Sequence, residues 1–317
     1  MNLSSPKTAV VALGGNAISP MGETDSLPNQ FRHTRESLVA VIHLIKSGYE
    51  LAITHGNAPQ VGNALLRTEL TADTAPLLPL YICVADIQGG MGYMIEQCLQ
   101  NVLKRSGIRK DVVTMITQVL IDENDPEVVN PTKYVGQRYD EDAARRLADR
   151  FGWQIRRTSA GDWRRVVPSP LPISIIESGS IKELTRAGKI VVAAGGGGIP
   201  VHPNEDGSLE GFDAVVDKDL ASAILAHEIG ATEFFILTDV DGVALNFGQR
   251  NEEWLSELTV NESRRFLEEG HFPPGSMGPK ITAAINFLEK GGNSVLITSI
   301  RKIREALKGE SGTVIRD

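Results

Sequence analysis

Three stretches of the sequence place glycines directly after a short apolar run. They read VVALGGNAISP at residues 10–20, AITHGNAPQVG at 52–62 and VVAAGGGGIPV at 191–201. Glycines at the end of a strand let backbone N–H groups approach an anion without a Cβ atom in the way. One such loop alone usually makes only a turn, but in an open parallel sheet all three would meet at one edge. Together they predict a binding site for a polyanion.

Three lysines indicate which chemistry that anion would undergo. Lys133 lies in NPTK, Lys218 in VVDKDLA and Lys280 in GSMGPK, and we expect each at a junction between a loop and a helix. Phosphoryl transfer needs mainly electrostatic stabilisation of oxygens, which scattered lysines supply. A lysine taken at random is a solvated surface charge, but the glycines and prolines around these three favour a site. Asp219, near a predicted helix start, either matches the helix dipole or orients Lys218.

Two common nucleotide-binding motifs do not fit the sequence. Neither Gly14-Gly15 nor the run ending at Gly198 has the GxGxxG spacing of a dinucleotide-binding turn. Asp213 and Asp217 stand where a ribose-binding acid would be expected, yet they precede a helical pattern instead of ending a strand. A Walker loop is also missing, because no glycine run is followed by Lys-Ser or Lys-Thr.

The elements that must position these residues alternate between strands and helices, which predicts an α/β fold with a largely parallel sheet. The apolar runs are continuous, as in strands covered on both faces. A helical apolar stripe ends at Gly48, and a second one belongs to the core and comprises Met277, Ile281, Ala284, Ile285 and Leu288. The expected strands are 8–13, 50–54, 111–121, 189–194, 233–238 and 294–298.

Residues 122–172 interrupt the alternation. They are rich in charge, proline and glycine, and long irregular insertions in α/β enzymes often cover a site. We therefore predict a mobile lid here, with a solvated surface loop as the alternative.

Composition narrows the possible partners and the compartment. A net charge of −8 over 317 residues argues against an extended nucleic-acid surface. No signal peptide and no stretch long enough to cross a membrane is visible, so we expect no membrane partner. The two cysteines, Cys83 and Cys98, are too few for a disulfide scaffold, fit a reducing cytoplasm and are expected to be small buried residues.

Seven motifs together resemble the carbamate kinases of the amino-acid kinase superfamily. They occur in the same order across essentially the whole chain and read ALGGNA, THGNAPQVG, DPEVVNPTK, RRVVPSP, AAGGGGIPV, DAVVDKDLA and FPPGSMGPK. The resemblance implies a single amino-acid-kinase domain over residues 1–317, built as a three-layer α/β/α sandwich, with a protruding lid subdomain at 122–172. It also implies a homodimer and the reversible reaction of ATP with carbamate to give ADP and carbamoyl phosphate, with Mg²⁺.

The resemblance also assigns roles to residues of this sequence. It implies that Lys218 and Lys280 neutralise charge between donor and acceptor, that Asp219 orients them, and that Lys133 reaches the substrate when the lid closes. The transferring phosphoryl group would be held by Gly14, Gly15, Asn16, Gly56 and Asn57, and the carbamate side of the cleft would be lined by Gly195, Gly196, Gly197 and Gly198. We interpret the four glycines as leaving room for a small phosphorylated substrate against the main chain.

The nucleotide is expected over ILTDVDGVALNFG, where Thr238, Asp239 and Val240 would take adenine and ribose, with Met277 and Lys280 nearby. The sequence contains no dense cage of carboxylates, so we expect Mg²⁺ to be held largely by phosphate oxygens.

Three stretches depart from the family pattern. Ala58 stands where a glycine is common, and its methyl group would shift the backbone if that position needs a positive φ. CVADIQGGMGY replaces a Gly-Ala-Met-Ser-Gln-Gly type of stretch and puts Asp86 on a helix at the cleft edge or dimer face. VDGVALNFG also differs from typical members.

Three hypotheses about function follow. The first is a kinase that makes or uses carbamoyl phosphate by direct in-line transfer. The second is a paralogous kinase acting on another small carboxylate or carbamate, which the altered ADIQGG stretch motivates. The third is a non-catalytic nucleotide-binding regulator, against which the presence of Lys133, Lys218, Asp219 and Lys280 counts.

Overall fold

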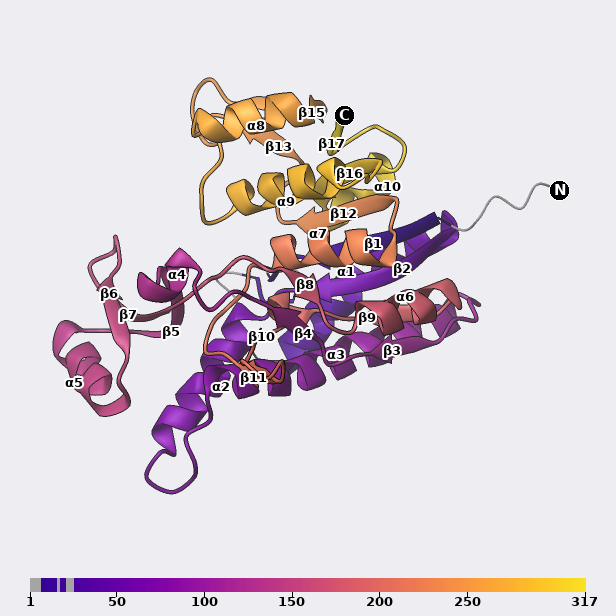
Figure 1. Ribbon diagram of the computed structural model, residues 1–317. Helices are drawn as coiled ribbons and strands as arrows, with labels where there is room; N and C mark the ends of the chain where they lie inside the picture. The colour runs from indigo at the N-terminus through magenta and orange to yellow at the C-terminus, as the bar shows by residue number, and fades with distance from the viewer. Residues whose placement is uncertain (1–6, 16–17, 21–25) are drawn as a thin grey trace.

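The computed structural model describes residues 7–15, 18–20 and 26–317, and its centre is an eight-stranded sheet (Figure 1). The strand order is β15-β17-β16-β12-β1-β2-β9-β3, and every neighbouring pair is parallel except β16 and β17. The strands are β1 (Lys7–Leu13), β2 (Tyr49–His55), β3 (Val112–Thr114), β9 (Ile190–Val192), β12 (Glu233–Thr238), β15 (Glu257–Thr259), β16 (Ser294–Ser299) and β17 (Thr313–Arg316).

Helices cover both faces of this sheet, which confirms the predicted α/β/α layering. In β1, Val10 and Ala12 face one hydrophobic cluster while Ala9, Val11 and Leu13 face the other, and all five are buried. This burial on both faces explains why the strands are apolar without alternation. The first cluster includes α6 (Ser178–Arg186), α7 (Lys218–Ile229), α8 (Val260–Glu268) and α9 (Met277–Glu289), and the second includes α1 (Leu27–Lys46), α3 (Leu80–Arg105) and α10 (Ile303–Ala306).

Local signals in the sequence set the ends of the first helix. Ser26 caps α1 by accepting a hydrogen bond from the backbone N–H of Asn29. Pro28 lies in the first turn, where a backbone N–H would have no partner within the helix, so its absence in proline costs nothing. The helix ends before Gly48, whose φ of +90° favours glycine. The predicted end of this helix is therefore confirmed.

One predicted strand is wrong. Residues 111–121 do not form one long strand: they contain β3 and β4 (Gln118–Leu120), which belong to different sheets. The chain leaves the central sheet at Thr117, whose backbone is hydrogen-bonded to a side chain of α3. β4 then joins a four-stranded sheet with β8 (Ser174–Ile175), β10 (Ile199–Pro203) and β11 (Leu209–Gly211).

The predicted strand at 189–194 is also too long at its end. β9 stops at Val192, and Ala194 has a φ of +48°, in the left-handed region that interrupts a strand.

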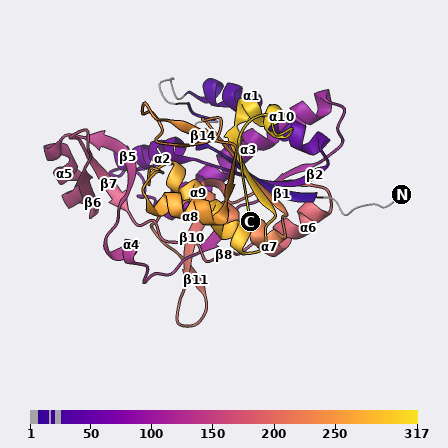
Figure 2. The ribbon, with the colours of Figure 1, turned by 90° about the horizontal axis from the view of Figure 1, so that it is seen from above.

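The interrupting segment has a fold of its own. It contains α4 (Pro126–Val129), α5 (Glu141–Phe151) and an antiparallel sheet of β5 (Lys133–Tyr139), β7 (Trp163–Val167) and β6 (Gln154–Arg157). Both Figure 1 and Figure 2 show α5, β6 and β7 standing away from the central sheet. Residues 126–167, called the protruding segment below, are therefore neither irregular nor a simple surface loop.

A third hydrophobic cluster joins the protruding segment to the rest of the molecule. Val135 and Val167 of the segment pack in it with Leu65 of α2 (Ala58–Leu70) and with Leu80 and Cys83 of α3. Cys83 and Cys98 are both buried free thiols, as predicted. A hairpin of β13 (Val243–Leu245) and β14 (Glu253–Leu255) completes the elements. Within the described ranges, no helix has both the length and the apolar character that a membrane span needs.

Candidate active site

The glycine loops meet at the carboxyl edge of β1, β2 and β9, as predicted, and we call this place the glycine edge. Leu13 at the end of β1 pairs with His55 of β2 on one side and with Leu237 of β12 on the other. The N–H of Gly14 donates to the carbonyl of Leu237 at 2.8 Å, and the N–H of Gly56 donates to Leu13 at 3.1 Å.

Close backbone packing explains one of these glycines. A Cβ on Gly56 would lie 2.9 Å from the backbone nitrogen of Gly15, which no side chain tolerates. Among the described residues, nothing lies within 4 Å of the place that a Cβ on Gly15 would take. Asn16 lies outside the described residues.

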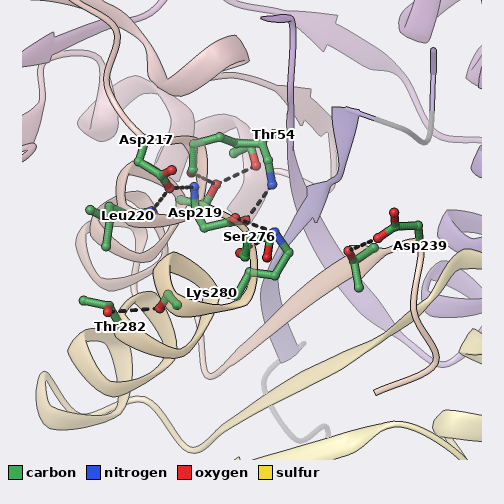
Figure 3. Close-up of polar contacts among 12 residues, drawn as sticks. Thr54, Asp217, Asp219, Leu220, Asp239, Ser276, Lys280 and Thr282 are labelled. Atoms are coloured by element: carbon green, nitrogen blue, oxygen red, sulfur yellow. Dashed lines mark hydrogen bonds and ion pairs between the residues drawn. The ribbon is translucent and has the colours of Figure 1, made fainter. Parts of the chain in front are cut away.

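Two of the predicted lysines share one carboxylate. Lys218 and Asp219 begin α7, and Asp217 caps that helix by accepting from the N–H of Asp219 at 2.9 Å. Lys218 Nζ donates to Asp219 Oδ1 at 2.6 Å, and Lys280 Nζ, from α9, donates to Asp219 Oδ2 at 3.0 Å. Figure 3 shows Asp219 and Lys280 pointing toward each other from these two helices. Asp219 therefore orients both lysines and is more than a helix-dipole partner.

Charge keeps Asp219 ionised. Burial by itself raises the pKa of this carboxyl, but the charges of Lys218 and Lys280 and their hydrogen bonds outweigh burial and hold the pKa at about 2. Both lysine side chains are mostly buried, at 12% and 15% exposed. The group of two ammonium ions and one carboxylate thus has a net positive charge in a partly dehydrated place, which suits an anionic substrate.

Lys133 comes to the same place from the protruding segment. It begins β5, not a helix as predicted, and its Nζ lies 3.8 Å from Oδ2 of Asp217. The structure therefore brings together all four predicted catalytic residues. It adds Asp217, which sequence reasoning had considered only as a ribose-binding acid. We call Lys133, Asp217, Lys218, Asp219 and Lys280 the lysine cluster.

The four-glycine stretch forms a tight turn that the protein's own atoms fill. Gly196, Gly197 and Gly198 have φ values of +68°, +99° and +92°. A Cβ on Gly195 would lie 2.4 Å from His55 Nε2, one on Gly196 would lie 2.0 Å from Asn57 Nδ2, and one on Gly197 would lie 2.3 Å from the carbonyl of Val216. A Cβ on Gly198 would likewise lie 2.9 Å from Val119 Cβ, so the interpretation that these glycines leave room for substrate is wrong at all four positions. We call residues 194–198 the glycine turn.

Asn57 is a polar residue that packs against the glycine turn. Its side chain is buried beside Gly196, and its Nδ2 has no hydrogen-bond partner among the residues that the structure describes. A buried amide donor without an acceptor costs stability, so its presence at the glycine edge fits a ligand oxygen.

The comparison with known proteins agrees with this geometry. Residues 7–299 match the Amino acid kinase family. The chain belongs to this family. It is 48% identical to the carbamate kinase of Pyrococcus furiosus over 98% of this chain and 99% of that protein. It is also 44% identical to the carbamate kinase-like protein YqeA of Escherichia coli, with the same coverage. The carbamate kinase of Giardia lamblia bound to AMP-PNP has a TM-score of 0.93 and 38% identity, covering 98% of this chain and 99% of that one.

The expected nucleotide residues of this amino acid kinase lie beside the first glycine loop and at the start of α9. Thr238 ends β12, and a Cβ on Gly14 would lie 3.6 Å from its Cα, so Thr238 lies beside the first glycine loop. Thr238 Oγ1 donates to Asp239, which Figure 3 shows apart from Asp219 and Lys280. Val240 follows it, half-buried, and Met277 begins α9, one turn before Lys280.

Two of the departures from the family pattern can be located in the structure. Ala58 begins α2 and, since only Ala194 and Asn246 have a positive φ among the described residues other than glycine, its methyl group causes no backbone strain. Asp86 is exposed on α3.

The lysine cluster does not form a metal site. Both oxygens of Asp219 accept from lysines, and Asp217 is occupied by its helix cap and by Lys133. No group of three or more His, Cys, Asp or Glu side chains suited to a metal occurs in the described part of the chain. The carboxylates present thus do not fit direct coordination of Mg²⁺, which needs free oxygen ligands.

A separate cavity of about 210 Å³ lies at the joint of the protruding segment. It is lined by Leu65 and Thr68 of α2 and by Trp153 and Arg165 of the segment, and it includes neither the glycine loops nor the lysine cluster. We place the active site at the glycine edge, where the charged groups converge.

His55, which sequence reasoning did not select, should make stability depend on pH. Burial, with a smaller effect from the charge of Lys218, lowers the pKa of His55 to about 4, although its hydrogen bond with the Gly56 carbonyl opposes this. In the unfolded chain the histidine pKa is about 6.5, so between about pH 6.5 and about pH 4 His55 is protonated in the unfolded state but neutral in the folded state. The free energy of unfolding therefore falls as the pH falls through this range. From pH 7.5 to 5 we expect His55 to account for a loss of roughly 2 kcal/mol.

Urea unfolding at both pH values measures this loss. The variant His55→Gln has no titrating group here and should show a correspondingly smaller pH dependence. Equal pH dependence in both proteins would contradict a buried neutral His55.

Proposed function

We propose that this protein is a carbamate kinase. The observation that carries the proposal is the pair Lys218 and Lys280 held on one buried carboxylate, Asp219, next to the glycine edge. The named carbamate kinases that match over nearly the whole chain support the substrate.

The chemistry is a direct phosphoryl transfer. An oxygen of the ADP β-phosphate attacks phosphorus, the bond between phosphorus and the carbamoyl oxygen breaks, and ATP and carbamate result; carbamate then decays to ammonia and carbon dioxide. The protein forms no covalent bond to the substrate in this reaction. Its main contribution is to stabilise the negative charge on the oxygens of the transferring phosphoryl group. Lys218 and Lys280 would do so, while Gly15 and Asn57 would donate hydrogen bonds to the same group. The sequence-based expectation that Gly14 and Gly56 also donate is wrong, because their N–H groups are bonded to the carbonyls of Leu237 and Leu13.

The nucleotide would bind beside Thr238, Asp239, Val240 and Met277. Mg²⁺, which neutralises phosphate charge when bound, would be held by phosphate oxygens and water, because the carboxylates of the lysine cluster are already paired.

The protruding segment would act as the lid, with residues 122–172 as the inserted subdomain. Lys133 at its base lies 3.8 Å from Asp217 and is 43% exposed, so it can reach a substrate from that side. The cavity at the joint leaves unfilled space where the segment meets α2 and α3.

Replacing Lys133 by alanine should lower kcat/KM for the small substrate more than it lowers the affinity for the nucleotide. We expect kcat/KM for carbamoyl phosphate to fall by about 10²-fold, since one cationic contact to the transferring group is lost. The Kd for ADP, measured by calorimetry, should change little. Lys189→Ala removes a similarly exposed lysine, paired with Asp111, and is the control. A loss confined to ADP affinity would contradict the lid role.

We also propose a homodimer in a reducing cytoplasm. The resemblance supports the dimer, and the two free buried thiols support the compartment. Light scattering should give about twice the chain mass of 34.3 kDa; a monomer would overturn the dimer.

The test of function is ATP formation from ADP, Mg²⁺ and carbamoyl phosphate by the purified protein. Activity that Lys218→Ala lacks would establish the carbamate kinase. If ADP binds but no ATP forms, the paralogue acting on another small carboxylate or carbamate becomes the better hypothesis. Two relatives are themselves named only carbamate kinase-like. A protein inactive on all such acceptors would be a nucleotide-binding regulator.

A further inference from the structure

Gln88 lies in the N-terminal half of α3, and its side chain is hydrogen-bonded to the glycine turn. We propose that Gln88 is a positioning residue that fixes the glycine turn, and through it Asn57 and Lys218, for phosphoryl transfer. The inference rests on the proposed function for its kinetic readout, but its structural readout does not.

Gln88 uses its whole amide. It is 2% exposed, its Oε1 accepts from the N–H of Thr117 at 2.7 Å, and its Nε2 donates to the carbonyls of Thr117 and Gly195, both at 3.1 Å. These partners need one acceptor and two donors at the same place. A carboxylate offers no donor and a thioether almost none, so only an amide meets the demand.

The glycine turn needs such support because its backbone is strained. Ala194 has a φ of +48°, and left-handed residues other than glycine persist only where their surroundings fix them. The N–H of Ala194 donates to Thr117 Oγ1 at 3.0 Å, and the N–H of Ile199 donates to the Thr117 carbonyl at 2.9 Å. Thr117 therefore holds both ends of the turn, and Gln88 holds Thr117 together with Gly195.

The other side of the turn faces the site. Gly195 packs on His55, Gly196 packs on the unpaired amide of Asn57, and Gly197 packs on the carbonyl of Val216. Val216 directly precedes Asp217, which caps α7 at Lys218. A displaced turn would therefore move both the Asn57 donor and the start of α7.

The variant Gln88→Met tests this, because it keeps the length of the side chain and removes all three hydrogen bonds. Gln100→Met, on the exposed side of the same helix, is the matched control. We expect kcat/KM for carbamoyl phosphate to fall by about 10²-fold, as misplaced groups in active sites do. The Kd for ADP should stay within about twofold, because Gln88 does not contact the predicted nucleotide residues. Parallel losses of both in a folded Gln88→Met protein would overturn the proposal.

A second pair of variants tests the same proposal if the Gln88→Met protein does not fold. Thr117→Ser keeps the hydroxyl that receives the Ala194 N–H and should retain activity, whereas Thr117→Val removes it and should show the same selective loss. Equal activity of the two would overturn the proposal.

Hydrogen exchange of the peptide 191–201 tests positioning without any activity. We expect exchange to be about tenfold faster in Gln88→Met than in wild type and unchanged in Gln100→Met, because lost hydrogen bonds raise local opening. Unchanged exchange overturns the inference. An inactive wild-type protein with faster exchange in Gln88→Met would instead count only against the proposed function.

Discussion

Lys218→Ala is expected to lower kcat by about 10³-fold while leaving ADP bound, because a donor aimed at developing charge acts mainly in the transition state. Lys218 Nζ is fixed by Asp219 at 2.6 Å and its side chain is only 12% exposed, so its charge acts from a fixed and mostly buried position. ATP formation from carbamoyl phosphate measures kcat, and calorimetry measures the Kd for ADP. Turnover equal to that of the wild type would remove Lys218 from the mechanism.

Lys218→Arg refines this test. The guanidinium keeps the charge but is larger and planar, so it does not match a site built around one ammonium at a fixed carboxylate oxygen. We expect it to recover only a small part of the lost turnover. Full recovery would mean that charge alone matters and that the geometry set by Asp219 does not.

Asp219→Asn should have the second large effect. The substitution keeps the shape but leaves Lys218 and Lys280 without their shared anion, and breaking a buried ion pair typically costs about 3–5 kcal/mol. Two unpaired ammonium groups also repel each other and leave their positions. We therefore expect a lower Tm together with a loss of about 10²-fold or more in kcat.

Thermal unfolding and the same ATP assay measure the two losses. Asp149→Asn, on the exposed surface of α5, is the control for a change of charge alone. An Asp219→Asn protein with the wild-type Tm and kcat would show that the carboxylate neither stabilises nor orients the lysines.

Much of the fold follows from local sequence. The sequences of β1, β2, β12 and β16 are easily recognised as continuous apolar runs, because these strands are buried on both faces. Parallel strands then bring the glycine loops to one edge, and flanking glycine and proline single out the lysines.

What the sequence did not predict depends on contacts between distant residues. The break of 111–121 into two strands occurs at Thr117, which is hydrogen-bonded to Gln88, 29 residues earlier. The glycine turn owes its composition to His55 and Asn57, about 140 residues earlier in the chain. Neither partner has a local pattern that would reveal it. The pairing of Asp219 with Lys280, 61 residues away, was expected from the family resemblance and not from a local pattern.

The position of β1 in the sheet has a consequence for biosynthesis. Ala9 pairs with Glu233, so β1 cannot pair with its neighbour β12 until most of the residues between them have been synthesised. At common translation rates this wait is roughly 10 to 45 s. During that time the β12 side of β1 stays unpaired and the sheet face that α7 and α9 later cover is exposed, which favours aggregation. The nascent chain should therefore depend on a chaperone that binds extended apolar segments, and the central sheet is completed only late in synthesis.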